Sequence, residues 1–82
     1  MKTQRPGRII CADPNVCHGQ PTFRGTRILV NDVIELVATG MNWDDIIKEC
    51  HGSISRSAIA EAIRCAGLAM VQHADEYLER PV

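Results

Sequence analysis

The segment from Asp13 to Ile28 constrains the fold of this 82-residue chain more than any other part. Turn-forming residues open the segment, and two short runs of strand formers follow, at Thr22-Phe23 and at residues 27–29. The link between these runs is Arg24-Gly25-Thr26, in which the glycine allows a tight backbone turn. The pattern predicts a short N-terminal β-hairpin that carries two arginines.

The remainder of the chain has apolar residues at helical spacing, divided by capping residues. Asn31, Asn42 and Ser55 are each placed to cap the start of a helix, and Gly40 is placed to end the first one. We therefore expect three helices after the hairpin, and a fourth where residues 72–79 continue as an acidic helix. The spacing predicts these core positions: Val33, Ile34, Val37, Ala38, Trp43, Ile46, Ile47, Cys50, Ile59, Ile63, Ala66 and Met70. Ile54, in the connection between the last two helices, is expected to pack between them.

Composition indicates one small, mainly α domain. Phe23, Trp43 and Tyr77 are the only aromatic residues, so the core must consist of aliphatic side chains, which favours packed helices over a large sheet. We expect residues 1–71 to form the domain and residues 72–82 to form a helical or flexible tail. A domain of this size buries only roughly 60–65% of its unfolded surface, so a dimer or a bound partner would add stability.

Residues 43–63 are expected to form a helix, a glycine-containing connection and a second helix, which is the pattern of a helix-turn-helix. Small hydroxyl residues and an arginine open the second helix, and such residues can contact phosphates or base edges. The same pattern also occurs in proteins that never bind DNA. The candidate DNA-binding residues are Arg24, Thr26 and Arg27 of the hairpin and Ser55, Arg56, Ser57 and Arg64 of the helix.

The net charge of −1 hides an uneven distribution. Residues 1–30 hold five Lys or Arg and one Asp, a net charge of +4, whereas the rest of the chain holds four cations and nine anions, a net charge of −5. The basic part can contact phosphate groups, or it can form ion pairs with acidic helices of the same or a neighbouring subunit. The sequence leaves both interpretations open.

Two features predict contacts with other proteins. The third helix has a second stripe of small residues at Ala58, Ala62, Cys65 and Ala69, which either packs in a homodimer or lies beneath the hairpin. The acidic tail would dock on a basic partner, or remain solvated in the isolated protein. The candidate partner-binding residues are Asp75, Glu76, Tyr77 and Leu78.

No catalytic or metal-binding motif is expected. The candidate reactive residues lack the context of a known active site, and Asp44-Asp45 suits the start of a helix. Cys17-His18 and Cys50-His51 do not have the spacing of a structural zinc site. We therefore expect no enzyme activity, cofactor or metal. No apolar run is long enough to span a membrane and no secretory signal opens the chain, so a cytoplasmic protein with reduced thiols is expected.

The motifs of residues 8–28 also resemble those of a known family. Arg8-Ile9 is followed by Asp-Pro-x-Val at residues 13–16 and by Gly-x-Pro-x-x-Arg-Gly-Thr-Arg-Ile at residues 19–28, and an amphipathic helix comes next. This arrangement is similar to the signature of the prokaryotic family called domain of unknown function 433, over about residues 8–69. The resemblance implies a homeodomain-like helix-turn-helix fold. It also implies the role of an antitoxin that binds operator DNA and neutralises a nuclease of the PIN type. The alternative function is a protein-interaction or dimerisation module that does not bind DNA.

Overall fold

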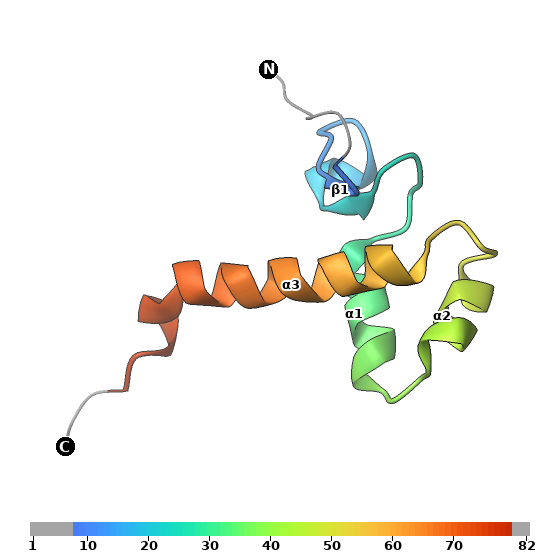
Figure 1. The fold of residues 1–82 in the computed structure, drawn as a ribbon. Coiled ribbons are helices and arrows are strands. Elements are labelled where there is room, and N and C mark those ends of the chain that lie inside the picture. Colours follow the sequence, from blue (N-terminus) through green and yellow to red (C-terminus); the bar gives the residue numbers. More distant parts are fainter. Residues whose placement is uncertain (1–7, 80–82) are drawn as a thin grey trace.

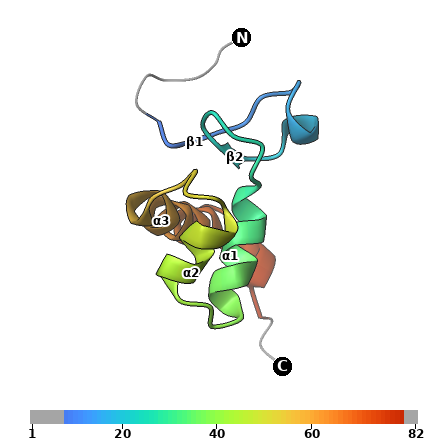
Figure 2. The same ribbon diagram turned by 90° about the vertical axis from the view of Figure 1, so that its right-hand side faces the viewer.

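The computed structural model describes residues 8–79, and this part of the chain is mainly helical. Two short strands, β1 (Ile10–Cys11) and β2 (Thr22–Phe23), come before three α-helices. The helices are α1 (Val30–Ala38), α2 (Trp43–Glu49) and α3 (Arg56–Gln72). Figure 1 shows α1 and α2 beside the first part of α3, and Figure 2 shows the strands above the helices. A mainly helical fold with an N-terminal pair of antiparallel strands is thus confirmed.

The strand pairing differs in detail from the predicted hairpin. Thr22-Phe23 pairs with Ile10–Cys11 in an antiparallel register, with Ile10 opposite Phe23 and Cys11 opposite Thr22. Residues 27–29 contribute only an isolated bridge between Leu29 and Thr22. The reason is that the chain enters α1 at Val30, directly after the bridge, so no further ladder forms. The tight link itself is as expected, because the Thr26 amide donates to the Phe23 carbonyl at 3.0 Å and Gly25 has a φ of +78°.

Asn31 is not the N-cap of the first helix, contrary to the sequence prediction. Helix α1 begins at Val30, and Leu29 takes the cap position without a side-chain hydrogen bond. The Val30 amide instead donates to the Pro21 carbonyl at 3.0 Å. Since this contact and the Thr22–Leu29 bridge hold the backbone in place, the helix starts two residues before the position that the local signal indicated.

The other capping predictions are confirmed. The Asn42 side chain accepts a hydrogen bond from the Asp45 amide at 2.9 Å, and the Ser55 hydroxyl accepts one from the Ala58 amide at 3.1 Å. Gly40 follows the end of α1 with a φ of +91°, a conformation that glycine adopts without strain.

The core forms where the hairpin and the three helices meet. Phe23, Val33, Ile46 and Ile59 are its largest fully buried side chains, and Ile54 lies buried in the same cluster. The buried residues are Phe23, Val30, Val33, Ile46, Ile54, Ala58, Ile59 and Ala62. Four predicted core positions are therefore confirmed as fully enclosed, namely Val33, Ile46, Ile54 and Ile59. Of the other predicted positions, Ala38 is exposed, and those in α1 and α2 are half-buried.

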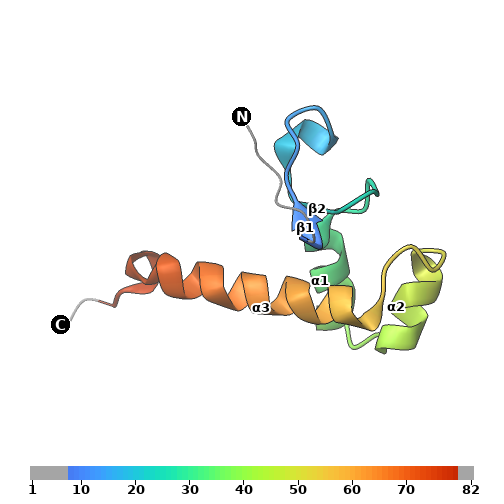
Figure 3. The same ribbon diagram turned by 45° about the horizontal axis from the view of Figure 1, so that its top comes forward.

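Helix α3 extends well past this core, as Figures 1 and 3 show. It has 17 residues, whereas α1 has nine and α2 has seven. At 1.5 Å per residue, α3 is about 25 Å long, and only its first part lies beside α1 and α2. The predictions that Ile63 and Met70 are core residues are consequently wrong, since these side chains are 38% and 54% exposed. No helix of the described residues lies beside α3 at that level.

The stripe of small residues in α3 is covered only in part. Ala58 and Ala62 are buried near the hairpin, Cys65 is half-buried, and Ala69 is exposed. After α3, a 3-10 turn, η2 (Ala74–Tyr77), takes the place of the possible fourth helix. A short 3-10 turn, η1 (Cys17–Gly19), also interrupts the loop between the strands. The expected end of the tail at Arg80-Pro81-Val82, and the cations Lys2 and Arg5, lie outside the described residues.

Candidate binding surfaces

Arg56, at the start of α3, is paired with the start of α2. Its guanidinium lies 2.9 Å from the Asp44 carboxylate and its Cζ lies 5.3 Å from the centroid of the Trp43 ring. Both members of the ion pair are more than 60% exposed, so the pair contributes at most about 1 kcal/mol. A stronger anion such as phosphate can therefore replace Asp44 at small cost, although the carboxylate lowers the local positive potential.

Two further candidates of α3 are exposed on the side of the helix away from the core. Ser57 lies in the first turn, and Arg64 forms an ion pair with Glu61 at 3.1 Å, one turn apart on the same helix. The spacing of Ser57 and Arg64 places them on one face of the helix. Ser55 is instead the N-cap of α3, and its hydroxyl oxygen accepts a hydrogen bond from the Ala58 amide.

The candidates of the hairpin are held by the turn. The Arg24 Nε donates a hydrogen bond to the Arg8 carbonyl. The Thr26 hydroxyl donates to the Phe23 carbonyl at 2.8 Å and accepts from the Ile28 amide at 3.0 Å, so it stabilises the turn. Arg27 is exposed, and its carbonyl accepts a hydrogen bond from the Cys17 thiol at 3.6 Å. The Thr26 hydroxyl, a candidate for DNA binding, is thus engaged within the turn.

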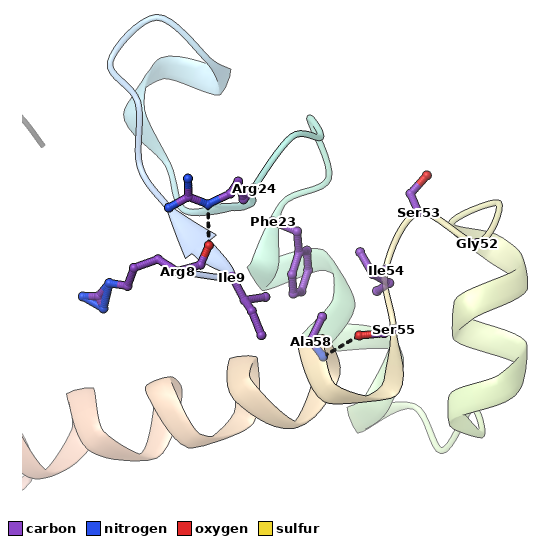
Figure 4. Close-up of a pocket in the computed structure, with 9 residues that line it drawn as sticks. All are labelled: Arg8, Ile9, Phe23, Arg24, Gly52, Ser53, Ile54, Ser55 and Ala58. Atoms are coloured by element: carbon purple, nitrogen blue, oxygen red, sulfur yellow. Dashed lines mark hydrogen bonds between the residues drawn. The ribbon is translucent and has the colours of Figure 1, made fainter. Parts of the chain in front are cut away.

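A hollow of about 410 Å³ lies between the hairpin and the start of α3 (Figure 4). Arg8 and Arg24 stand on the hairpin side, Phe23 and Ile54 form apolar walls, and Ser55 lies on the side of α3. The structure therefore brings Arg24 close to the first turn of α3. It does not bring Arg24 to Arg56, because Arg56 points to Trp43 and Asp44 of α2.

A second hollow, of about 610 Å³, separates the hairpin turn from α1 and α2. Its apolar floor includes Ile28, Val33 and Leu36, and charged side chains of both signs, among them Arg27 and Glu49, stand on its lining. Arg24 and Arg27 thus line different hollows, although three positions separate them.

The residues proposed to bind a partner protein form an exposed segment at the end of the described chain. Tyr77 and Leu78 are 60% and 77% exposed. Asp75 and Glu76 lie in the first turn of η2, and the Glu76 carboxylate is 3.6 Å from His73 Nδ1. The segment presents two apolar side chains beside carboxylates, without burying either against the helices.

The four cysteines are free thiols, and two have altered acidity. Burial, followed by the charge of Glu49, raises the pKa of Cys50 above its ordinary value of 9.0. Burial also raises the pKa of Cys65, and the hydrogen bond from this thiol to Glu61 at 3.6 Å adds to the effect. A thiolate is the reactive form of cysteine, so both thiols are poor nucleophiles at neutral pH.

We expect alkylation of Cys50 and Cys65 by iodoacetamide at pH 8 to be slower in the folded protein than in urea. The folded pKa lies above the unfolded one, so the neutral thiols favour the folded state below pH 9, and this contribution is lost as the pH rises through the folded pKa. Peptide mass spectrometry at several times and pH values measures each rate. Equal rates in the folded and unfolded protein would contradict the assignment.

Residues 8–79 contain no group of three His, Cys, Asp or Glu side chains that could hold a metal ion. In the same range, no helix combines the length and the apolar character required to cross a membrane.

Sequence reasoning missed several residues that shape these surfaces. Arg8 lines the first hollow and accepts from Arg24, while Trp43 and Asp44 hold Arg56. His51 adopts a φ of +55°, which is uncommon for a residue with a side chain. The acidic residues at the start of α2 are evident in the sequence. Their contact with Arg56 is not, because twelve positions separate Asp44 from Arg56 and only the packing of α2 on α3 brings them together.

Comparison with known proteins identifies a family. No curated protein and no solved structure gives a significant match to the chain. A family model does match, over residues 10–66, and its description is protein of unknown function (DUF433). The match covers β1, β2, α1, α2 and more than half of α3, which includes the whole core. The chain therefore belongs to the DUF433 family.

Proposed function

We propose that this protein is an antitoxin-like binding module that neutralises a PIN-like nuclease through its C-terminal segment. The observation that carries this proposal is the exposure of Tyr77 and Leu78 beside Asp75 and Glu76. Apolar anchors of this kind fill pockets on a partner, and neighbouring carboxylates direct them to a cationic surface. Nucleases need cationic grooves to hold their phosphate substrates, so such a groove is a complementary partner.

The acidic net charge of residues 31–82 also favours binding to a basic partner. Residues 31–82 hold four cations and nine anions, so the part of the protein that carries the tail has a net charge of −5. This charge steers the C-terminal segment towards a basic surface. The antitoxin role itself comes from the family resemblance of residues 8–28.

Co-expression with the nuclease encoded by a neighbouring gene tests this function. We expect the two proteins to co-purify and the nuclease to lose activity in the complex. Separate purification of two folded proteins, with full nuclease activity in the mixture, would rule out neutralisation.

Operator binding by α2 and α3, as a helix-turn-helix, is the second part of the proposal. Its support is the arrangement of two capped helices that are joined by a short connection and packed around Ile46, Ile54 and Ile59. Arg56, Ser57 and Arg64 are the residues proposed to contact DNA from α3. Arg24 and Arg27 are proposed to contact phosphates from the hairpin. A homodimer would place two such units on one operator.

Arg56 and Asp44 provide a matched test of DNA binding. We expect Arg56→Gln to weaken operator binding about tenfold or more, since it removes the cation. Asp44→Asn should strengthen binding several-fold, because it releases Arg56 from its ion pair. Fluorescence anisotropy with operator DNA at several salt concentrations measures both effects. If neither substitution changes the affinity, α3 does not read DNA through Arg56. If the unmodified protein does not bind the operator at all, the protein is a neutralising module alone.

The hairpin requires a separate measurement. Replacement of both Arg24 and Arg27 by glutamine should reduce the slope of log affinity against log salt by about two if both contact phosphates. An unchanged slope would remove the hairpin from the DNA interface.

A further inference from the structure

The exposed end of α3 carries an apolar patch around one glycine. Ile63 lies one turn before Gly67, and Met70 and Val71 lie one turn after it, so the four residues share one side of the helix. We call these residues the Gly67 patch. The three large side chains are 38%, 54% and 72% exposed. A helix surface of this kind is normally covered.

No close contact within the described residues requires a glycine at position 67. A Cβ at this position would meet no atom within 4 Å outside the neighbouring residues and the backbone of its own helix. Its φ is not in the positive range that favours glycine. Glycine within a helix costs about 1 kcal/mol relative to alanine, so the position lowers the stability of α3 without any gain inside the monomer. The missing side chain does create a groove between Ile63, Met70 and Val71, into which a second helix can approach closely.

We propose that the Gly67 patch is the contact between two copies of this chain, with their α3 helices crossing at Gly67. Charge selects this occupant. Arg64 is the single charged residue from 62 to 72, and it is already paired with Glu61 at 3.1 Å. A neutral apolar surface is not complementary to DNA or to a cationic nuclease groove, whereas it is complementary to an identical surface.

A two-fold axis through Gly67 gives this contact a simple register. In an antiparallel crossing, each Gly67 faces its own copy, and Ile63 of one chain faces Val71 of the other. The large side chains of each copy then enter the groove that the glycine of the other copy leaves open. The bodies formed by α1 and α2 lie at opposite ends of such a pair, because α3 extends past them in only one direction (Figure 1).

The size of the patch sets the strength of the dimer. Each half-exposed aliphatic side chain offers on the order of 100 Å² of surface, so the patch supplies a few hundred Å² per chain. A standard stable interface buries about 800 Å² per partner, and smaller interfaces form transient complexes. The dimer is therefore expected to be weak and transient.

Sedimentation equilibrium of the full chain at about 1 μM to 1 mM tests the dimer. We expect the unmodified protein to associate reversibly, and Met70→Glu to weaken this association at least a hundredfold. Gln20→Glu is the matched control, because it adds the same charge at an exposed residue far from α3 and should leave association unchanged. Met70 is 54% exposed, so circular dichroism should show Met70→Glu to be as folded as the unmodified chain.

Gly67→Met tests the crossing point without removing apolar surface. The monomer has open space at this position, so the helical content should stay equal or increase, whereas the dissociation constant should rise at least tenfold. A protein that stays monomeric at 1 mM, or a dimer that Met70→Glu leaves intact, would overturn the proposal. A dimer that tolerates Gly67→Met would overturn the crossing at Gly67. The inference specifies the contact of the homodimer that the proposed function invokes. None of these experiments uses the nuclease or DNA, so a failure of this contact is distinguishable from a failure of neutralisation or of operator binding.

Discussion

Ile59→Ala is expected to lower the free energy of unfolding by about 2–5 kcal/mol. Ile59 has 0% exposure and lies in α3 where this helix meets the hairpin and the other two helices. The substitution removes apolar contacts and leaves a cavity that the rigid core cannot fill completely. Native domains are stable by only about 5–15 kcal/mol, and a small domain lies towards the lower end, so much of the protein should unfold at 37 °C.

Leu68→Ala is the matched control in the same helix. Leu68 is 57% exposed and lies beyond the core, so its truncation should change the stability by less than about 1 kcal/mol. Urea unfolding followed by circular dichroism measures both variants. The midpoint should fall strongly for Ile59→Ala with an unchanged slope. Equal losses for the two variants would mean that the end of α3 is buried in solution, contrary to the structure.

The second large effect concerns the C-terminal segment. Replacement of both Tyr77 and Leu78 by alanine should weaken binding to the partner nuclease at least a hundredfold, which corresponds to about 3 kcal/mol. The same variant should keep its melting temperature, since these side chains are 60% and 77% exposed in the isolated chain. This separation distinguishes a binding role from a structural one.

Titration calorimetry with the purified nuclease gives the affinity, and Leu68→Ala again serves as a control with an exposed leucine outside the segment. Asp75→Asn with Glu76→Gln should mainly slow association and reduce its salt dependence, because exposed charges act on encounter more than on the bound complex. Neutralisation that survives the loss of both Tyr77 and Leu78 would refute the assignment of this segment as the docking surface.

The contacts of the candidate arginines in the structure bear on the proposed DNA binding. The sequence analysis named arginines of the hairpin and of α3 as candidates for DNA binding. In the structure, Arg56 contacts α2, and Arg64 contacts Glu61 of its own helix. Arg24 lies at the hollow beside Ser55. DNA binding therefore requires the ion pairs of Arg56 and Arg64 to exchange for phosphates, which makes the Asp44→Asn experiment the most direct test of this function.

Local chemistry by itself determined the helix boundaries that depend on contacts between near neighbours. The caps at Asn42 and Ser55 each join a side chain to an amide three residues later, and Gly40 needs only a backbone conformation. The periodicity of apolar residues likewise identified Val33, Ile46 and Ile59 as core residues. These features were predictable because each arises within one or two helical turns.

The tertiary structure alone decided what depends on distant partners. It paired Thr22-Phe23 with Ile10–Cys11, moved the start of α1 to Val30 and joined Arg56 to Asp44. In the tertiary structure, Ile63 and Met70 are also exposed, although their helical spacing continues the apolar stripe that contains the buried Ile59. The physical reason is that periodicity shows which side of a helix is apolar, whereas burial depends on whether another element reaches that level, and α1 and α2 lie beside only the first part of α3 (Figure 1).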